Sequence, residues 1–251
     1  MKIHPFSITL LDPVFYSREG LVGAFSPKYL HATAINHAVA YTLGKEVDQP
    51  YIMSDKEGGR NTPRYTSSYV QEFGFYYTPA RPRSNVSYHV EVVKADGDEL
   101  INKRYGSIKL ANGKSESRPE VLKASQLFFL SPETEFEGFV INYKDAVELP
   151  VELIIRLGSF RGKAKLGIGK GYEPKNYNKK HHVSHPVDPL VSDVVRGVMV
   201  NMFPYPIVEN AICRNCADIK IGGLTKAIAL PEGTQITKPL RVAPKGSSLI
   251  L

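Results

Sequence analysis

The first hydrophobic patterns along the chain predict a β-strand followed by one long helix. Apolar and polar residues alternate over residues 6–10, the period of a half-buried strand, and Asp12–Pro13 ends this run. Ser26–Pro27 then predicts a helix start, with serine as the N-cap and proline in the first turn. Apolar residues recur at helical spacing over residues 30–43, and Gly44 predicts the end of this helix.

The middle of the chain predicts antiparallel sheet interrupted by an insertion. Residues 45–72 are polar and have no periodicity, which predicts a long loop or insertion. Short runs of alternating or apolar residues follow at 88–92, 127–130 and 136–140, and Asn112–Gly113 is a strong hairpin signal. These runs favour strands joined by turns, and therefore antiparallel pairing.

The second half predicts one short helix, one strand and two irregular segments. Residues 151–157, directly after Pro150, predict one or two helical turns. Residues 172–190 predict a loop insertion, residues 194–203 a strand, and residues from about 222 onward an irregular tail. Together the elements predict a single α+β domain over residues 1–251, with large loop and β-hairpin insertions.

The stretch Arg156–Gly171, RLGSFRGKAKLGIGKG, mixes basic residues with glycines and contains no acid. Its second part alternates, so that one face of a strand is apolar and the other is cationic with little side-chain bulk. The apolar positions are Ala164, Leu166 and Ile168, and the opposite positions are Lys163, Lys165, Gly167 and Gly169. Glycine would let a polyanion approach the main chain, and lysine would neutralise its phosphates.

The charge balance singles out the same region. The chain has 32 Lys and Arg against 25 Asp and Glu, a net charge of +7. Residues 156–180 hold eight Lys or Arg and one acid, Glu173, so this segment nets +7 and the rest of the chain is neutral. Localised positive charge is typical of a surface that binds nucleic acid or another extended anion. A glycine-rich hairpin with a solvated basic face is the other interpretation.

Candidate contacts to a nucleic acid fall into two groups. Aromatic residues beside arginines suit base stacking combined with phosphate contact, and Tyr76 and Tyr77 precede Arg81 and Arg83 in this way. A core strand that leaves through a proline turn explains the same four residues. The basic candidates for phosphate contact are Arg156, Arg161, Lys163, Lys165, Lys170, Lys179 and Lys180.

The two cysteines, Cys213 and Cys216, lie in a C-x-x-C spacing. This spacing fits half of a zinc site, a disulfide or redox pair, or two buried thiols without further role. Histidines at 181, 182 and 185 could complete a zinc site, and His182 and His185 are the candidates retained. Their order and separation match no zinc-finger spacing, so we expect no metal and no other cofactor.

Enzyme motifs are absent from the chain. It has no phosphate-binding loop, no dinucleotide fingerprint, no nucleophile elbow and no His-Glu metal motif. A metal-independent ribonuclease needs only a positioned base and cationic stabilisation, which leave no linear motif. His31 and His37, in the predicted helix, are expected to cap or pack. We therefore expect a non-enzyme.

Membrane and secretion signals are also missing. No window approaches the ~20 apolar residues that span a bilayer. The N-terminal segment has only Lys2 as a charge before an interrupted apolar run, which does not fit a signal peptide. We expect a cytoplasmic protein with no membrane partner.

Five sequence blocks, in order over residues 7–205, carry a family resemblance. The blocks are LLDPVFYSREG, KYLHATAINHAVAYTLG, FYYTPARP, IIRLGSFRGKAKL and HPVDPL. Together they resemble the Cas-five-type subunit of type I-D CRISPR Cascade, within the RAMP superfamily of CRISPR RNA-binding proteins. The LGSFRG segment departs from the aromatic-plus-lysine form of that family.

The resemblance implies an RRM-like (ferredoxin-like) core, with the helix over residues 29–43 as its first helix. It also implies a non-catalytic subunit that binds the 5′ handle of guide RNA. This subunit would lie between the backbone RAMP subunits and the large subunit, and would help recognise target DNA near the protospacer-adjacent motif. The alternative is a metal-independent endoribonuclease that processes precursor CRISPR RNA.

Overall fold

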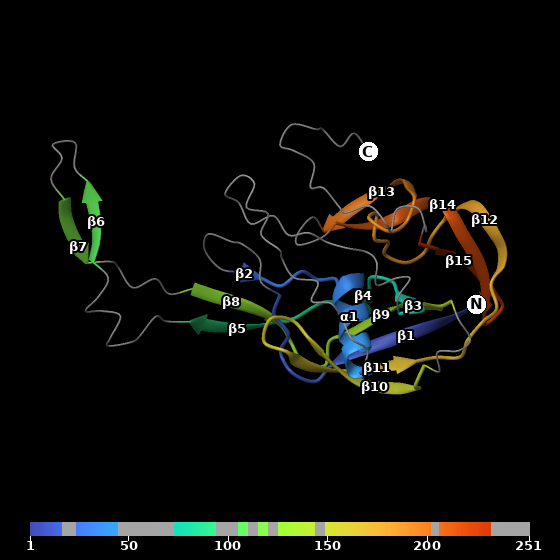
Figure 1. Ribbon diagram of the computed structural model, residues 1–251, viewed down its shortest axis with the longest axis horizontal. Coiled ribbons are helices and arrows are strands. Elements are labelled where there is room, and N and C mark those ends of the chain that lie inside the picture. Colours follow the sequence, from blue (N-terminus) through green and yellow to red (C-terminus); the bar gives the residue numbers. More distant parts are fainter. Residues whose placement is uncertain are drawn as a thin grey trace.

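In the computed structural model, most of the described residues lie in β-strands, which pair almost entirely antiparallel, and the described part of the chain contains one helix (Figure 1). The described residues are 1–16, 24–44, 73–93, 105–109, 115–119, 125–143, 149–201 and 206–231. The predicted insertion at 45–72 lies outside them, and so does the predicted Asn112–Gly113 turn. Within the described residues no helix is long and apolar enough to cross a bilayer.

The central sheet has the strand order β10-β11-β1-β9-β3, and β4 also pairs with β9. Its members are β1 (Lys2–Leu10), β3 (Phe75–Tyr77), β4 (Arg81–Pro82), β9 (Glu135–Asn142), β10 (Glu152–Leu157) and β11 (Gly162–Ile168). All of these pairings are antiparallel. The predicted strand at 6–10 is therefore confirmed, and it lies in the middle of this sheet.

The helix α1 (Ala32–Thr42) packs on the central sheet through the buried side chains of Ile35 and Val39 (Figure 1). It begins later than predicted. His31 is its N-cap, and the Nδ1 atom of His31 accepts a hydrogen bond from the backbone N–H of Thr33 at 3.1 Å. The Ser26–Pro27 start is wrong because the residues from Ser26 to Leu30 are not helical, and the Leu30 backbone pairs with Ala80. The predicted end is confirmed, since Gly44 has a left-handed φ of 67°.

A second sheet has the order β12-β14-β13, and β15 also pairs with β14. Its strands are β12 (Lys175–His182), β13 (Val194–Asn201), β14 (Ile207–Ile221) and β15 (Leu224–Ala229). Two predictions are corrected here. The segment expected to be a loop at 172–190 contains β12, and the tail expected from 222 begins with a hairpin whose turn is Gly222–Gly223.

Two smaller sheets complete the described structure. β2 (Ala24–Phe25), β8 (Ser125–Leu130) and β5 (Tyr88–Val93) form one, in the order β2-β8-β5. β6 (Tyr105–Lys109) pairs with β7 (Ser115–Pro119) in the other. The antiparallel pairing predicted for the middle of the chain is confirmed by β5 with β8 and by β6 with β7.

Residues 152–157 form strand β10, where the sequence predicts helical turns over 151–157. Ile155 and Leu157 are buried and alternate with the exposed side chains of Glu152, Ile154 and Arg156. The backbone pairs with β11 over its whole length. Two consecutive isoleucines favour a strand, and pairing with a partner strand outweighs the weak helix signal of a preceding proline.

Candidate nucleic-acid interface

The β10–β11 hairpin presents the basic face that the sequence predicts. In β11, Ala164, Leu166 and Ile168 are buried, whereas Lys163 and Lys165 are exposed, so the predicted alternation is confirmed. Lys163 lies directly opposite Arg156 of β10 in the antiparallel register. Directly opposite residues project from the same face of a sheet, so these two cations lie side by side.

Carboxylates neutralise some of the cations on this hairpin and leave others without an acidic partner among the described residues. The Lys165 Nζ atom lies 2.7 Å from the Glu152 carboxylate. By contrast, Arg156, Arg161 and Lys163 form no ion pair with the described residues. The Arg156 Nη1 atom donates to the backbone carbonyl of Arg161 at 3.3 Å, which holds the guanidinium across the turn. The hairpin therefore concentrates uncompensated charge at its turn end.

The glycines of this stretch serve internal packing more than the approach of a ligand. Gly158 has a φ of 75°, and a Cβ atom there would lie 2.5 Å from the carbonyl oxygen of Phe15. A Cβ at Gly162 would lie 2.8 Å from the carbonyl oxygen of Pro13. Gly169 and Gly171 are similarly close to β1. Of the glycines predicted to line an anion site, Gly167 is the one on the exposed face with no such restriction, since its nearest neighbour is a side chain at 3.4 Å.

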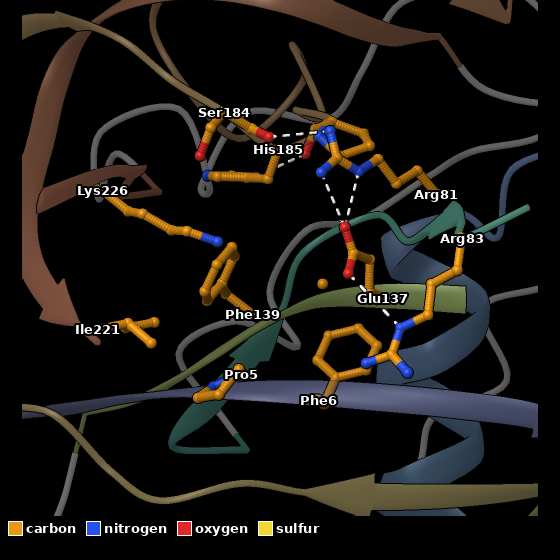
Figure 2. Close-up of a pocket in the computed structure, with 12 residues that line it drawn as sticks. Pro5, Phe6, Arg81, Arg83, Glu137, Phe139, Ser184, His185, Ile221 and Lys226 are labelled. Atoms are coloured by element: carbon orange, nitrogen blue, oxygen red, sulfur yellow. Dashed lines mark hydrogen bonds and ion pairs between the residues drawn. The ribbon is translucent and has the colours of Figure 1, made fainter. Parts of the chain in front are cut away.

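Arg81 and Arg83 lie at the other edge of the same sheet, and each is paired with acids (Figure 2). The Nε and Nη2 atoms of Arg81 donate to Glu137 Oε1 at 2.9 and 2.7 Å. Arg83 donates through Nη1 to the Glu135 carboxylate at 3.2 Å, and its Nε atom lies 3.5 Å from Glu137 Oε2. These arginines therefore bring less free charge to an anion than the hairpin cations do.

A cleft separates these arginines from the second sheet (Figure 2). Phe139 forms one wall, with the His185 ring at 5.6 Å and the Lys226 Nζ atom 5.8 Å from its ring centre. The Nη1 atom of Arg81 donates across the cleft to the carbonyl of Ser184 at 3.2 Å. These contacts connect the central sheet to Lys226 of β15 and to Ser184 and His185, which follow β12.

His185 is held as the neutral imidazole. Its Nε2 atom accepts a hydrogen bond from the backbone N–H of Ala229 at 3.1 Å, so the proton is on Nδ1, which donates to the carbonyl of Pro186 at 2.8 Å. Burial lowers the pKa of His185 to about 4. Since both ring nitrogens are occupied by backbone groups, His185 is unavailable as a metal ligand.

We expect His185 to make folding sensitive to acid. Its pKa in the unfolded chain, about 6.5, exceeds the folded value of about 4, so the unfolded chain takes up the proton first as pH falls. This site should therefore lower the free energy of unfolding by about 1.4 kcal/mol per pH unit from pH 6.5 down to 4. Chemical denaturation across this range, compared with His185→Gln, measures it. Curves of wild type and variant that run parallel would contradict the assignment.

Tyr76 and Tyr77 are core residues, so the prediction that they stack on bases is wrong. Their exposed fractions are 1% and 0%. Tyr77 packs edge-on against Phe6 and Phe75, at ring-centre distances of 5.2 and 5.6 Å, and burial raises its pKa. The alternative interpretation, a core strand that leaves through a proline turn, describes β3.

An exposed aromatic residue does lie on the hairpin, and it was not among the predicted contacts. Phe160, in the turn between β10 and β11, is 63% exposed. The signal available in the sequence is a phenylalanine inside a polar turn, between Gly158 and Gly162 and next to Arg161.

The remaining cations are spread over two parts of the molecule. Lys170 is exposed just after β11, whereas Lys180 is exposed on β12 of the second sheet. Lys179 also belongs to β12, where its backbone lies opposite Cys216. The eight basic residues that are close in sequence therefore do not form one continuous strand face.

Cys213 and Cys216 are buried and free in β14. Their thiols interact with each other, which raises the pKa of Cys213 and lowers that of Cys216. Cys213 lies opposite His181 in the register of β12, but His182 is on the exposed side of that strand. Among the described residues, no group of three or more ligand side chains comes together that could hold a metal ion.

Fold and site together define a mostly antiparallel β protein with a cationic hairpin at one edge of its central sheet. The sequence model of one family, the type I-D CRISPR-associated protein Cas5/Csc1, matches residues 1–239. The chain belongs to this family, and the family resemblance in its sequence blocks is confirmed.

Curated protein sequences include no significant match to the chain. Among solved structures, a chain of "Cryo-EM structure of the Type III-B Cmr-beta bound to cognate target RNA and AMPPnP, state 1" is similar, with a TM-score of 0.44 and 10% identity. A chain of "Cryo-EM structure of the Type III-B Cmr-beta bound to cognate target RNA" has a TM-score of 0.42 and 9% identity. Both similarities cover 84% of this chain and 86% of the other.

Proposed function

We propose that this protein is a non-catalytic RNA-binding subunit of a type I-D CRISPR surveillance (Cascade) complex. It binds the 5′ handle of guide RNA through the β10–β11 hairpin. The observation that carries this proposal is the group of Arg156, Arg161 and Lys163, three exposed cations that no described carboxylate neutralises. Backbone phosphates of a single strand would neutralise them, which fixes the position of the RNA without reading its sequence.

The rest of the family-based proposal concerns partners and fold. The subunit sits in the cytoplasm between backbone RAMP subunits and the large subunit, near the place where target DNA is read. Its core is RRM-like: β1 and β3 are connected through α1 and are separated in the sheet by the antiparallel strand β9. This split βαβ arrangement is the first half of a ferredoxin-like fold, and it supports the proposal.

A non-catalytic role agrees with the placement of the histidines. His31, His37 and His185 have pKa values lowered by burial, to about 3, 4 and 4. None of the seven histidines falls within residues 152–168, which form the hairpin. The hairpin itself therefore contributes no imidazole that could act as a general acid or base.

The test is to incubate the full-length protein with end-labelled CRISPR repeat RNA in EDTA, and to follow retention and integrity together. We expect saturable retention that weakens as salt is raised, with the RNA intact. Specific cleavage within the repeat would replace this proposal with the endoribonuclease alternative. Equal affinity for an unrelated RNA of the same length would contradict specific binding of the 5′ handle and would support RNA binding without sequence preference.

A further inference from the structure

Phe160 is exposed at the turn of the β10–β11 hairpin, yet it rests on two buried rings. Its ring centre lies 5.6 Å from that of Phe129 and 5.8 Å from that of Phe15, at interplanar angles of 31° and 41°. Phe15 and Phe129 are only 6% and 5% exposed, and they also contact each other at 5.1 Å. The Phe160 ring is therefore supported from below by the protein while most of its surface faces solvent.

Backbone contacts hold this turn against the segment that follows β1. The N–H of Ser159 donates to the carbonyl of Phe15 at 2.7 Å. The N–H of Lys163 donates to the Asp12 carboxylate at 2.9 Å, and the carbonyl of Lys163 accepts from the N–H of Leu11, also at 2.9 Å. Phe160 is thus positioned in advance, so that a ligand would lose little conformational entropy in ordering it.

The hairpin carries cationic residues on either side of Phe160 in the sequence. Arg161 follows it directly, with a left-handed φ of 56°, and Arg156 and Lys163 face each other at the adjoining end of the hairpin. No acidic residue occurs in the sequence from Leu153 to Tyr172. The nearby Asp12 carboxylate is occupied by the backbone N–H of Lys163. An aromatic surface beside uncompensated cations matches a nucleotide, which has a flat base and a charged phosphate.

We propose that Phe160 stacks on one unpaired nucleobase of a single-stranded RNA whose adjoining phosphates contact Arg156, Arg161 and Lys163. This inference rests on the proposed RNA-binding function and adds a defined base position to it. An apolar side chain of a partner protein is the competing occupant, and the charge around the ring disfavours it.

The chain has no tryptophan, so Phe160→Trp creates a single-tryptophan reporter at this position. The matched control is Tyr41→Trp, which replaces another exposed aromatic residue, 76% exposed on α1. The probes are a 12-nucleotide oligoadenylate, a 12-base-pair RNA duplex, and heparin as a polyanion without bases. We expect quenching and a shift of the indole emission for F160W with oligoadenylate only, and no change for Y41W with any probe.

Affinity measurements distinguish the contribution of base stacking from that of the cations and from effects on protein packing. Phe160→Ala and Phe160→Leu should both weaken oligoadenylate binding about 10-fold, because both variants remove the ring on which the base would stack. Leucine keeps apolar contact with Phe15 and Phe129, so a normal melting temperature in F160L excludes misfolding as the cause. The log–log salt dependence should stay as in wild type, since no cation is removed.

The outcomes also distinguish this inference from the proposed function. Salt-dependent RNA binding with an unquenched F160W indole, or with unchanged affinity in F160A and F160L, overturns the stacking position and leaves RNA binding in place. Equal quenching by heparin also overturns stacking on a base. A wild-type protein that binds neither oligoadenylate nor CRISPR repeat RNA overturns both proposals.

Discussion

Replacing Arg156, Arg161 and Lys163 together by alanine is expected to weaken binding of single-stranded RNA by about 100-fold at 0.1 M salt. Each phosphate contact to a single strand contributes about 0.7 to the log–log slope of affinity against salt, so three contacts contribute about 2. These cations are exposed, and no described carboxylate competes for them. Binding isotherms of oligoadenylate at four or more salt concentrations, compared with wild type, give both the affinity and the slope.

The matched control for this variant removes three cations elsewhere. Lys28, Arg196 and Lys220 are exposed outside the hairpin, and their joint replacement lowers the net charge by the same amount. We expect the control to change the slope by less than about 0.5, because long-range charge effects are screened within about 10 Å at 0.1 M salt. Equal slopes in the two triple variants would contradict a localised phosphate site.

Replacing Asn36 by alanine is expected to lower the free energy of unfolding by about 3 kcal/mol. Asn36 is fully buried on α1, and its side chain completes the hydrogen bonding of Tyr77 in β3. Its Oδ1 atom accepts from the Tyr77 N–H at 2.9 Å, and its Nδ2 atom donates to the Tyr77 carbonyl at 2.9 Å and to the Ala32 carbonyl at 2.8 Å. Alanine would leave two backbone groups of β3 buried and unpaired, at about 1–3 kcal/mol each before relaxation.

Chemical denaturation of the purified protein measures this loss, and Thr42→Ala provides the control. Thr42 lies on the same helix, and its hydroxyl donates to the Ala38 carbonyl at 2.8 Å, but the residue is exposed and water can replace the bond. We expect less than about 0.5 kcal/mol for this control. A value for Asn36→Ala as small as that of the control would mean that water or a shift of β3 satisfies Tyr77.

The Asn36–Tyr77 contact belongs to a wider set of contacts between the family-like sequence blocks. Asn36 lies in the block KYLHATAINHAVAYTLG and Tyr77 in FYYTPARP. His31, from the first of these two blocks, lies 3.5 Å through Nε2 from the Asp188 carboxylate of HPVDPL, and both are buried. Some of the residues that carry the family resemblance therefore have a structural role, since they provide the partners that buried polar groups require.

The same holds for the first and fourth blocks. Asp12 of LLDPVFYSREG accepts from the Lys163 N–H, and Phe15 contacts Phe160 of the hairpin turn. The N-terminal segment thus supports the hairpin, although about 150 residues separate the two in sequence. Sequence spacing does not predict such a contact, because the contact depends on β1 and β11 being neighbours in the sheet.

The local hydrophobic pattern was sufficient to predict those elements whose own apolar periodicity determines which side chains are buried. The alternation in β1 and β11, the helix up to Gly44 and the cationic face of the hairpin could all be predicted, because each follows from the period of apolar residues over one short segment. Residues 151–157 were mistaken for a helix because pairing with β11, a tertiary contact, determines their backbone.

Long-range contacts decided which of the predicted residues remain free to bind. Glu152 neutralises Lys165 across the β10–β11 ladder, and Glu137 on β9 holds Arg81. Tyr76 and Tyr77 are buried in the core, whereas Phe160 is exposed and packs on buried aromatic rings. Burial and ion pairing depend on which strands become neighbours in a sheet. The composition of one segment does not indicate which strands those are. The charge of the stretch could therefore be read from the chain, but its three available cations and its aromatic surface only from the fold.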